Sequence, residues 1–144
     1  MKPKYTAIVP YELAVKLRDI GYPQNIGHNW YDNKGSLVKV LPFNDEVNAP
    51  TYAEVLDWLA DKEIYPEVNA YPVASQSKGW YTEYEAVVVD ARKGAGEIRT
   101  KIEGEHSPFS GEYEDWCECC ADAIEKALDI IRKENDKKEE HGEE

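Results

Sequence analysis

The sequence is poor in the residues that most often identify a chemistry. Its 144 residues include three cysteines, three histidines, one methionine and two phenylalanines. Basic side chains are also scarce: 17 Lys and Arg stand against 29 Asp and Glu, a net charge of −12. A nucleic-acid-binding surface needs clustered Lys and Arg, so direct binding of nucleic acid is not expected. No apolar run approaches the ~20 residues of a membrane span, so no membrane partner is expected.

The N-terminal segment lacks the unbroken apolar stretch and the small-residue cleavage site of a signal peptide, so none is expected. The three cysteines, Cys117, Cys119 and Cys120, have no distant partner with which to build a disulfide framework. An odd number of neighbouring cysteines fits a reducing compartment. We therefore expect a cytoplasmic protein.

What the sequence does contain is three amphipathic helical patterns. In the first, an apolar stripe begins at Leu13 and stops at Gly21, a residue type that commonly terminates helices. The second covers about residues 52–62 and begins with the capping-box spacing of Thr51 and Glu54. The third covers about residues 112–134 and is the longest. Its stripe consists of Tyr113, Trp116, Cys117, Cys120, Ile124, Ala127, Leu128 and Ile131.

Strand patterns lie between the helices. The turn residues Asp32-Asn33-Lys34-Gly35 predict a small hairpin over about residues 30–41. Three more strands joined by short turns are predicted over residues 64–73, 80–90 and 98–102. The first of these contains two prolines and is expected at a sheet edge.

The predicted order is α-ββ-α-βββ-α, and the predicted fold class is α+β. We expect a single domain over residues 1–134. Its antiparallel sheet would be a three-stranded meander plus a small hairpin, covered by three amphipathic helices. Residues 135–144 carry charge and no apolar side chain, which predicts a disordered tail.

Negative charge is concentrated in one segment. Between Ile102 and Glu125 there are eight acids and no Lys or Arg. Seven of them are the candidate partner-binding residues: Glu103, Glu105, Glu112, Glu114, Asp115, Glu118 and Asp122. In the simplest interpretation, acids at the start of the last helix favour its dipole and the others solvate a loop. In a second, the segment docks a basic protein.

A third interpretation of the same segment is a divalent-cation site. Its ligands would come from Glu103, Glu105, Glu112, Glu114 or Asp115. The spacing does not match that of a calcium-binding loop. Neither a metal nor a cofactor is therefore expected.

The cysteine cluster is best explained by packing. Cys117 and Cys120 fall on the apolar stripe of the last helix, whereas Cys119 faces elsewhere. A zinc site would need four converging ligands, and the further candidates, His28 and His106, lie in distant loops. A reactive thiol at Cys119 is the remaining alternative.

Four aromatic residues stand at the starts of predicted strands: Trp30, Tyr31, Trp80 and Tyr81. Rings at such places are often half-buried. Because their neighbours are acidic, an aromatic protein-contact surface is favoured over stacking on nucleic-acid bases.

The segments ELAVKLRDIGYPQ, WYDNKGSLVKV and APTYAEVLDWLADKE, with AIEKALDII near the end, show a resemblance over most of residues 5–131. The chain resembles a group of small uncharacterised proteins encoded by prophages, phages and mobile elements of gut bacteria. The resemblance implies a bacterial, phage-derived accessory protein of the cytoplasm. It brings no assigned activity and no functional residues.

The sequence therefore predicts a non-enzymatic protein that binds an unidentified basic protein through its acidic segment. One alternative is an enzyme or metal-binding protein that uses loop carboxylates and His106. Another is an acidic mimic of DNA that blocks a nucleic-acid-binding protein.

Overall fold

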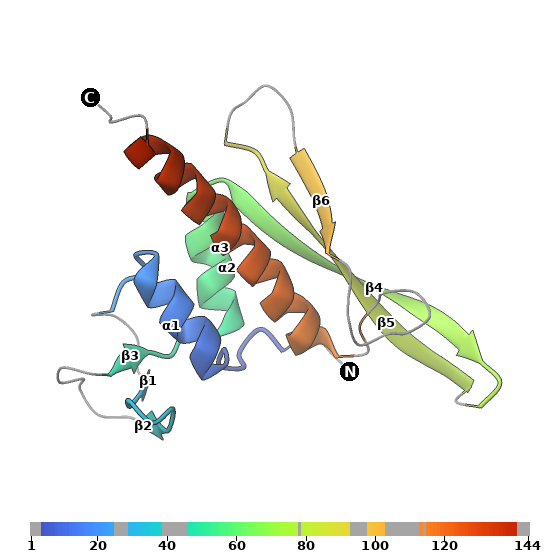
Figure 1. Ribbon diagram of the computed structural model, residues 1–144. Coiled ribbons are helices and arrows are strands. Elements are labelled where there is room, and N and C mark those ends of the chain that lie inside the picture. The colour runs from blue at the N-terminus through green and yellow to red at the C-terminus, as the bar shows by residue number, and fades with distance from the viewer. Residues whose placement is uncertain are drawn as a thin grey trace. The chain divides into compact units, whose positions relative to one another are not determined.

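The structure is a computed structural model, and it describes residues 4–24, 29–38, 46–77, 79–92, 98–102, 113 and 115–140. Only the backbone is described for residues 98–102 and 137–140. In this part of the chain there are three helices and two antiparallel three-stranded sheets (Figure 1). The predicted fold class, α+β, is confirmed.

The chain divides into two compact units. One consists of Tyr5–Trp58 with Leu128–Glu144, and the other of Met1–Lys4 with Leu59–Ala127. The divisions fall inside α2 (Tyr52–Asp61) and α3 (Trp116–Glu140), so each unit contains part of both helices. Each unit has its own sheet. The single domain over residues 1–134 stays a prediction.

The first helix, α1 (Tyr11–Asp19), buries an apolar stripe that includes Leu17. Its end is where the sequence predicts it. Gly21 has a φ of 107°, and its N–H donates to the Arg18 carbonyl at 3.1 Å, while the Tyr22 N–H donates to the Leu17 carbonyl at 2.9 Å. Glycine reaches a positive φ at little cost, so this residue terminates the helix.

The small sheet has the order β2-β1-β3, and each strand is two residues long: β1 (Trp30–Tyr31), β2 (Leu37–Val38) and β3 (Val47–Asn48). The predicted hairpin is β1-β2. Its turn is closed by the Gly35 N–H, which donates to the Asp32 carbonyl at 3.0 Å. β3 was not predicted from the sequence, because two residues are too few to show an alternating pattern.

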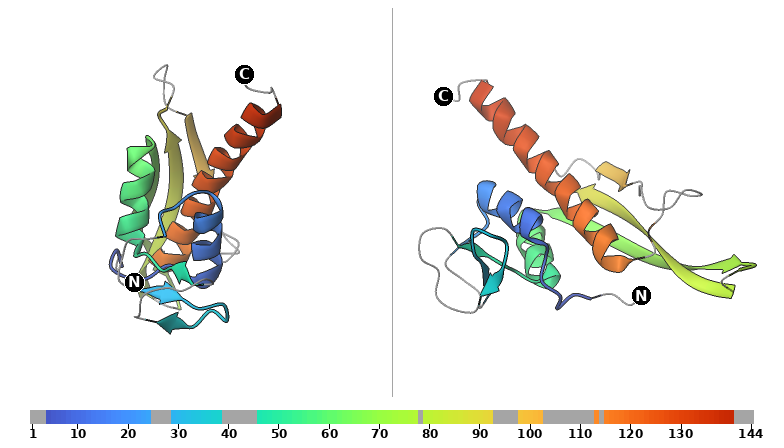
Figure 2. Two further views of the ribbon diagram at one scale, coloured as in Figure 1. Left: turned by 90° about the vertical axis from the view of Figure 1, so that its left-hand side faces the viewer. Right: turned by 60° about the horizontal axis from the view of Figure 1, so that its bottom comes forward.

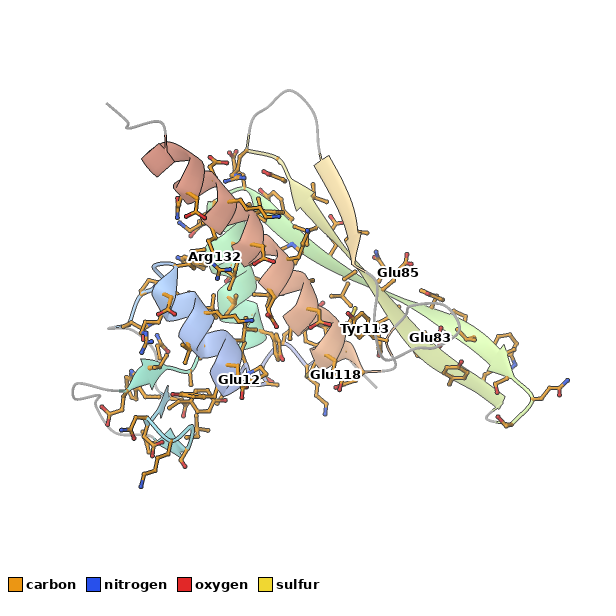
Figure 3. The ribbon with its side chains drawn as sticks, viewed as in Figure 1. Glu12, Glu83, Glu85, Tyr113, Glu118 and Arg132 are labelled. Atoms are coloured by element: carbon orange, nitrogen blue, oxygen red, sulfur yellow. The ribbon has the colours of Figure 1, made fainter. Side chains whose placement is uncertain are left out.

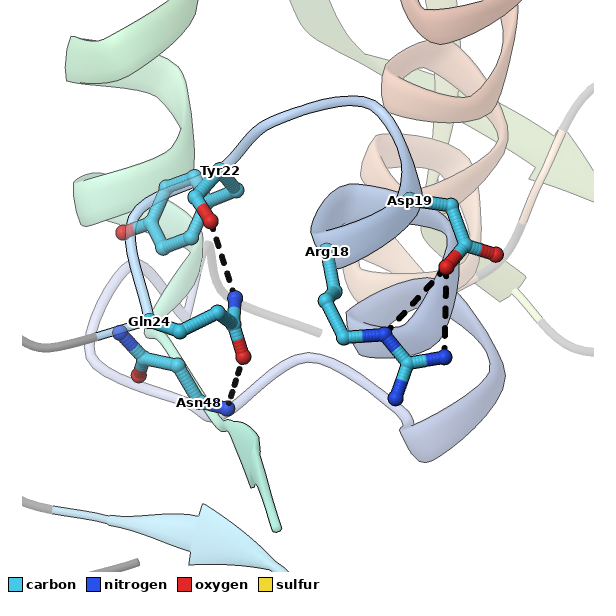
Figure 4. A network of polar contacts seen from close by, with 5 residues as sticks. All are labelled: Arg18, Asp19, Tyr22, Gln24 and Asn48. Atoms are coloured by element: carbon cyan, nitrogen blue, oxygen red, sulfur yellow. Dashed lines mark hydrogen bonds and ion pairs between the residues drawn. The ribbon is translucent and has the colours of Figure 1, made fainter. Parts of the chain in front are cut away.

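A side-chain amide holds β3 in place. The Gln24 Oε1 accepts a hydrogen bond from the Asn48 backbone N–H at 2.8 Å, and the Gln24 Nε2 donates to the Tyr22 carbonyl at 3.0 Å (Figure 4). Asn48 is itself buried and donates from Nδ2 to the Pro23 carbonyl at 3.0 Å. Buried polar groups are thus paired, which fixes the position of this short strand.

The second helix, α2, begins with the predicted capping box. The Thr51 backbone N–H donates to the Glu54 carboxylate at 2.8 Å, and the Glu54 N–H donates to the Thr51 hydroxyl at 3.2 Å. Trp58 contacts Tyr22 edge to face, with ring centroids 5.2 Å apart. Burial and the nearby Glu54 carboxylate raise the pKa of Tyr22 to about 12.

The larger sheet is the predicted meander, in the order β4-β5-β6. Its strands are β4 (Ile64–Ser75), β5 (Gly79–Asp90) and β6 (Ile98–Ile102). β4 lies at the edge, as its prolines predict, and Pro66 and Pro72 pair with Val88 and Thr82. On the face of β5 that contains Tyr84, Ala86 and Val88, all three side chains are buried.

The last helix, α3, differs from its prediction at both ends. It begins at Trp116 rather than near residue 112, because Tyr113 is engaged by the sheet and Asp115 caps the helix. It continues to Glu140 rather than ending near 134. Residues 135–140 of the predicted tail are therefore helical, since Lys and Glu are good helix formers and an established helix extends readily. Residues 141–144 lie outside the described residues. No helix in the described residues is long and apolar enough to cross a bilayer.

Candidate functional site

The start of α3 is tied to the larger sheet through Tyr113. The Tyr84 N–H donates to the Tyr113 carbonyl at 2.6 Å, and the Tyr113 N–H donates to the Tyr84 carbonyl at 2.9 Å. The Tyr113 side chain is fully buried, and its hydroxyl donates to the Asp122 carboxylate at 2.5 Å. One residue therefore connects the central strand β5 with the second turn of α3.

Asp115 caps the same helix. Its carboxylate accepts a hydrogen bond from the Cys117 backbone N–H at 3.3 Å, and its carbonyl accepts one from the Cys119 N–H at 3.2 Å. This is the position and the residue type preferred at a helix N-terminus. A carboxylate there also interacts favourably with the helix dipole.

These contacts bring carboxylates of β5 and α3 together. Besides burial, the carboxylates of Asp122 and Glu85 contribute to raising the pKa of Cys119 to about 12. Glu118, the residue before Cys119 in α3, is exposed. Figure 3 shows Glu85 and Glu118 on either side of Tyr113. We call Glu85, Asp115, Glu118 and Asp122 the acidic surface.

Three of the seven predicted partner-binding residues are therefore placed by the structure, and they occur together: Asp115, Glu118 and Asp122. The other four, Glu103, Glu105, Glu112 and Glu114, lie outside the described residues, as does His106. Two of the placed carboxylates also support the fold, because Asp115 caps α3 and Asp122 binds the Tyr113 hydroxyl. Glu118 is the exposed member.

Glu85 was not predicted. It belongs to β5, far from the acidic segment in the sequence, and the pairing of its neighbour Tyr84 with Tyr113 connects this strand with that segment. The signal available in the sequence was the alternation of Glu83 and Glu85 along this strand. Glu83 is 6% exposed and accepts a hydrogen bond from the Tyr81 hydroxyl at 3.1 Å, so it is part of the fold rather than of the surface.

The prediction for the cysteines was wrong for Cys119 and Cys117 and is confirmed for Cys120. Cys119 and Cys120 are both buried, and Cys117 is half-exposed. The buried stripe is wide enough to hold adjacent residues, as it does again at Ala123 and Ile124. Burial of Cys119 and the raised pKa of its thiol both argue against the alternative of a reactive thiol there.

The far part of the β4–β5 hairpin presents a second feature. Ala70, Pro72 and Ala74 of β4 share a face with Trp80 and Thr82 of β5, according to the strand register. All but the half-buried Thr82 are exposed, and Trp80 is 76% exposed. We call these five residues the arm face. It continues the face that is buried at Tyr84, Ala86 and Val88, and the hairpin extends past the start of α3 in Figure 1 and in the right panel of Figure 2.

Metal ligation finds no support in the described part of the chain. No group of three or more His, Cys, Asp or Glu side chains there is arranged to hold an ion. His28, His106 and His141 all lie outside the described residues.

Comparisons with protein-family models, with curated proteins and with solved structures find no match to this chain.

Proposed function

We propose that this protein acts by binding another protein, of basic charge, through the acidic surface. The observation that carries the proposal is the meeting of two acidic segments. Residues 79–90 and 115–125 contain seven acids and no Lys or Arg. The backbone pairing of Tyr84 with Tyr113 joins the two segments. Concentrated charge of one sign steers a partner of the opposite sign and selects against others.

Not every carboxylate of the two segments is available to a partner. Asp90 is neutralised by Arg92 at 2.9 Å, and Glu83 is buried. Glu118 is exposed, and Glu85, Asp115 and Asp122 are half-buried. The acidic surface thus offers a partner a small number of carboxylates on a rigid support, which favours defined geometry over diffuse attraction.

The resemblance to proteins of mobile elements directs the search for the partner to a bacterial cell. A phage-derived accessory protein in the bacterial cytoplasm would act on host proteins. This origin and location form part of the proposal.

The test compares two variants that lose the same charge. The first combines Glu85→Gln, Asp115→Asn and Glu118→Gln, and the Asp115→Asn substitution keeps a side-chain oxygen for the helix cap. The second combines Glu12→Gln, Asp19→Asn and Asp57→Asn, three exposed acids of the other unit. Each immobilised protein is incubated with a bacterial lysate, and bound proteins are identified by mass spectrometry.

We expect the wild type and the second variant to capture the same basic proteins and the first variant to lose them. Capture should also fall as salt rises, because exposed charges are screened. The melting temperatures of both variants should stay close to that of the wild type. If the first variant captures the same proteins as the wild type, the proposal is wrong.

A further inference from the structure

The arm face is an apolar surface on an otherwise strongly acidic chain. Between Ala70 and Thr82 the sequence contains one charged residue, Lys78, which lies outside the described residues. The exposed side chains of the arm face are alanines, a proline and a tryptophan. A protein of this size can leave single apolar residues exposed, but a contiguous strip of them marks an interaction surface.

One member of the acidic surface, Asp115, lies at the end of this strip. Tyr84 follows Thr82 on the same face of β5, and it is the point at which the face becomes buried. Asp115 follows Tyr113 by two residues, and its carboxylate adds to burial in raising the pKa of Tyr84. Tyr113 pairs with Tyr84 directly. An apolar strip with a charged border has the composition of a protein interface, in which the core is apolar and the rim is polar.

The length of the strip suits a short α-helix of a partner protein. From Ala70 to Ala74 the strand advances four residues, or ~13 Å at ~3.3 Å per residue. A helix covers that length in about two and a half turns, at ~5.4 Å per turn. Such a helix presents two or three apolar side chains to the strip. Its flanking positions lie over the border, where charge complementarity to Asp115 requires Lys or Arg.

We propose that the arm face receives a basic amphipathic helix of a partner protein, with Trp80 as its main apolar contact. This inference rests on the proposed function, because the acidic surface supplies the attraction for the basic side chains. Exposed tryptophan is the residue type most enriched among side chains that dominate binding. The apolar strip sets how long the partner stays bound, and the acidic surface sets how fast it arrives.

The test uses synthetic peptides as probes. The first is a peptide of about 20 residues, above the ~12–15 residues below which isolated helices are marginal in water, with leucines at helical spacing and lysines elsewhere. The second has the same composition in scrambled order, and in the third every lysine is replaced by glutamate. Trp80 is the most exposed tryptophan, since Trp30 and Trp116 are buried and Trp58 is half-buried. Its fluorescence therefore reports on the arm face.

We expect the first peptide to bind and to shift the tryptophan emission to shorter wavelengths, as water is excluded from the Trp80 ring. The other two peptides should bind much more weakly. Trp80→Ala lacks the reporting ring, so its affinity is measured by the fluorescence anisotropy of a dye-labelled first peptide, and it should be lower by about 30-fold, the effect expected at a dominant contact. Leu37→Ala, which removes another exposed apolar side chain in the other unit, should leave it unchanged.

The variant that combines Glu85→Gln, Asp115→Asn and Glu118→Gln should bind the first peptide more weakly and with a smaller dependence on salt. Its tryptophan emission should still shift when the peptide is saturating. If Trp80→Ala binds the first peptide as the wild type does, the inference about the arm face is wrong and the proposed function survives. If Trp80→Ala lowers the affinity for the first peptide but the triple variant of the acidic surface does not, the acidic surface takes no part in binding and the proposed function fails. If the chain alone is a dimer that Trp80→Ala makes monomeric, a second copy occupies the arm face and the inference is wrong.

Discussion

Replacing Tyr113 by phenylalanine removes one hydroxyl and leaves the buried ring in place. The hydroxyl donates to the Asp122 carboxylate at 2.5 Å, and this is the side-chain contact between the residue that pairs with β5 and the second turn of α3. A hydrogen bond to a charged group contributes about 1.5–3 kcal/mol to stability. Because Asp122 is half-buried and water can replace part of the bond, we expect the lower end of that range, about 1.5 kcal/mol.

This free energy corresponds to a measurable change in melting temperature. The entropy of unfolding is about 2.1 cal/mol/K per residue, or ~300 cal/mol/K for 144 residues. A loss of about 1.5 kcal/mol then lowers the melting temperature by about 5 °C. Differential scanning calorimetry and urea unfolding would both detect this change. The matched control is Tyr65→Phe, which removes a hydroxyl from a tyrosine that is 40% exposed and should change stability by less than about 0.5 kcal/mol.

A double-mutant cycle isolates the contact itself. Tyr113→Phe and Asp122→Ala, made singly and together, should give a coupling free energy of about 1 kcal/mol or more. A value near zero would refute the assignment of Asp122 to Tyr113.

Two further predictions concern the backbone and the thiols. Glu63 has a φ of 61°, a left-handed conformation that costs a residue with a side chain about 1–2 kcal/mol. Glu63→Gly should therefore raise the free energy of unfolding, measured in urea, by a net ~0.5–1 kcal/mol, whereas the control Lys62→Gly should lower it. Burial raises the pKa of Cys119 to about 12, and it also raises the pKa of Cys120, whereas unfolded thiols ionise near 9.0. The stability that these thiols contribute is thus intact below pH 9.0 and falls as the pH rises from there toward 12, which urea unfolding across that range would measure. In the native protein, iodoacetamide should label Cys117 before Cys119 and Cys120, and equal labelling of all three would contradict their burial.

The elements that were predicted correctly are those whose signal is local. The capping box of Thr51 and Glu54 specifies the start of α2 from residues three apart, and Gly21 specifies the end of α1. Both devices act within one turn of a helix, so the sequence contains everything needed to recognise them. The meander is equally local, because its strands follow one another through short turns.

The errors occur where a distant residue decides. Tyr113 fits the apolar stripe of α3 well, but its backbone pairs with Tyr84 of β5. No sequence pattern near Tyr113 predicts this pairing. Cys119 was assigned to the wrong side because the width of a buried stripe depends on what packs against the helix. Glu85 joined the acidic surface, and Trp80 the arm face, through strand pairing alone. The candidate site was therefore predicted in charge and in part of its residues, but not in its extent.

The two prolines of β4 have a consequence for how this protein behaves at high concentration. Successive residues of an edge strand turn their N–H groups alternately toward the sheet and toward solvent, and Pro66 and Pro72 are an even number of residues apart. Neither can donate to β5, so both occupy positions where the missing N–H would have pointed outward. The outer side of β4 therefore lacks donors at two places, and a strand from a neighbouring molecule cannot form a continuous ladder there. Growth of the sheet from one molecule to the next, the first step toward fibrils, is blocked along this edge by two residues that cost the native sheet no hydrogen bond.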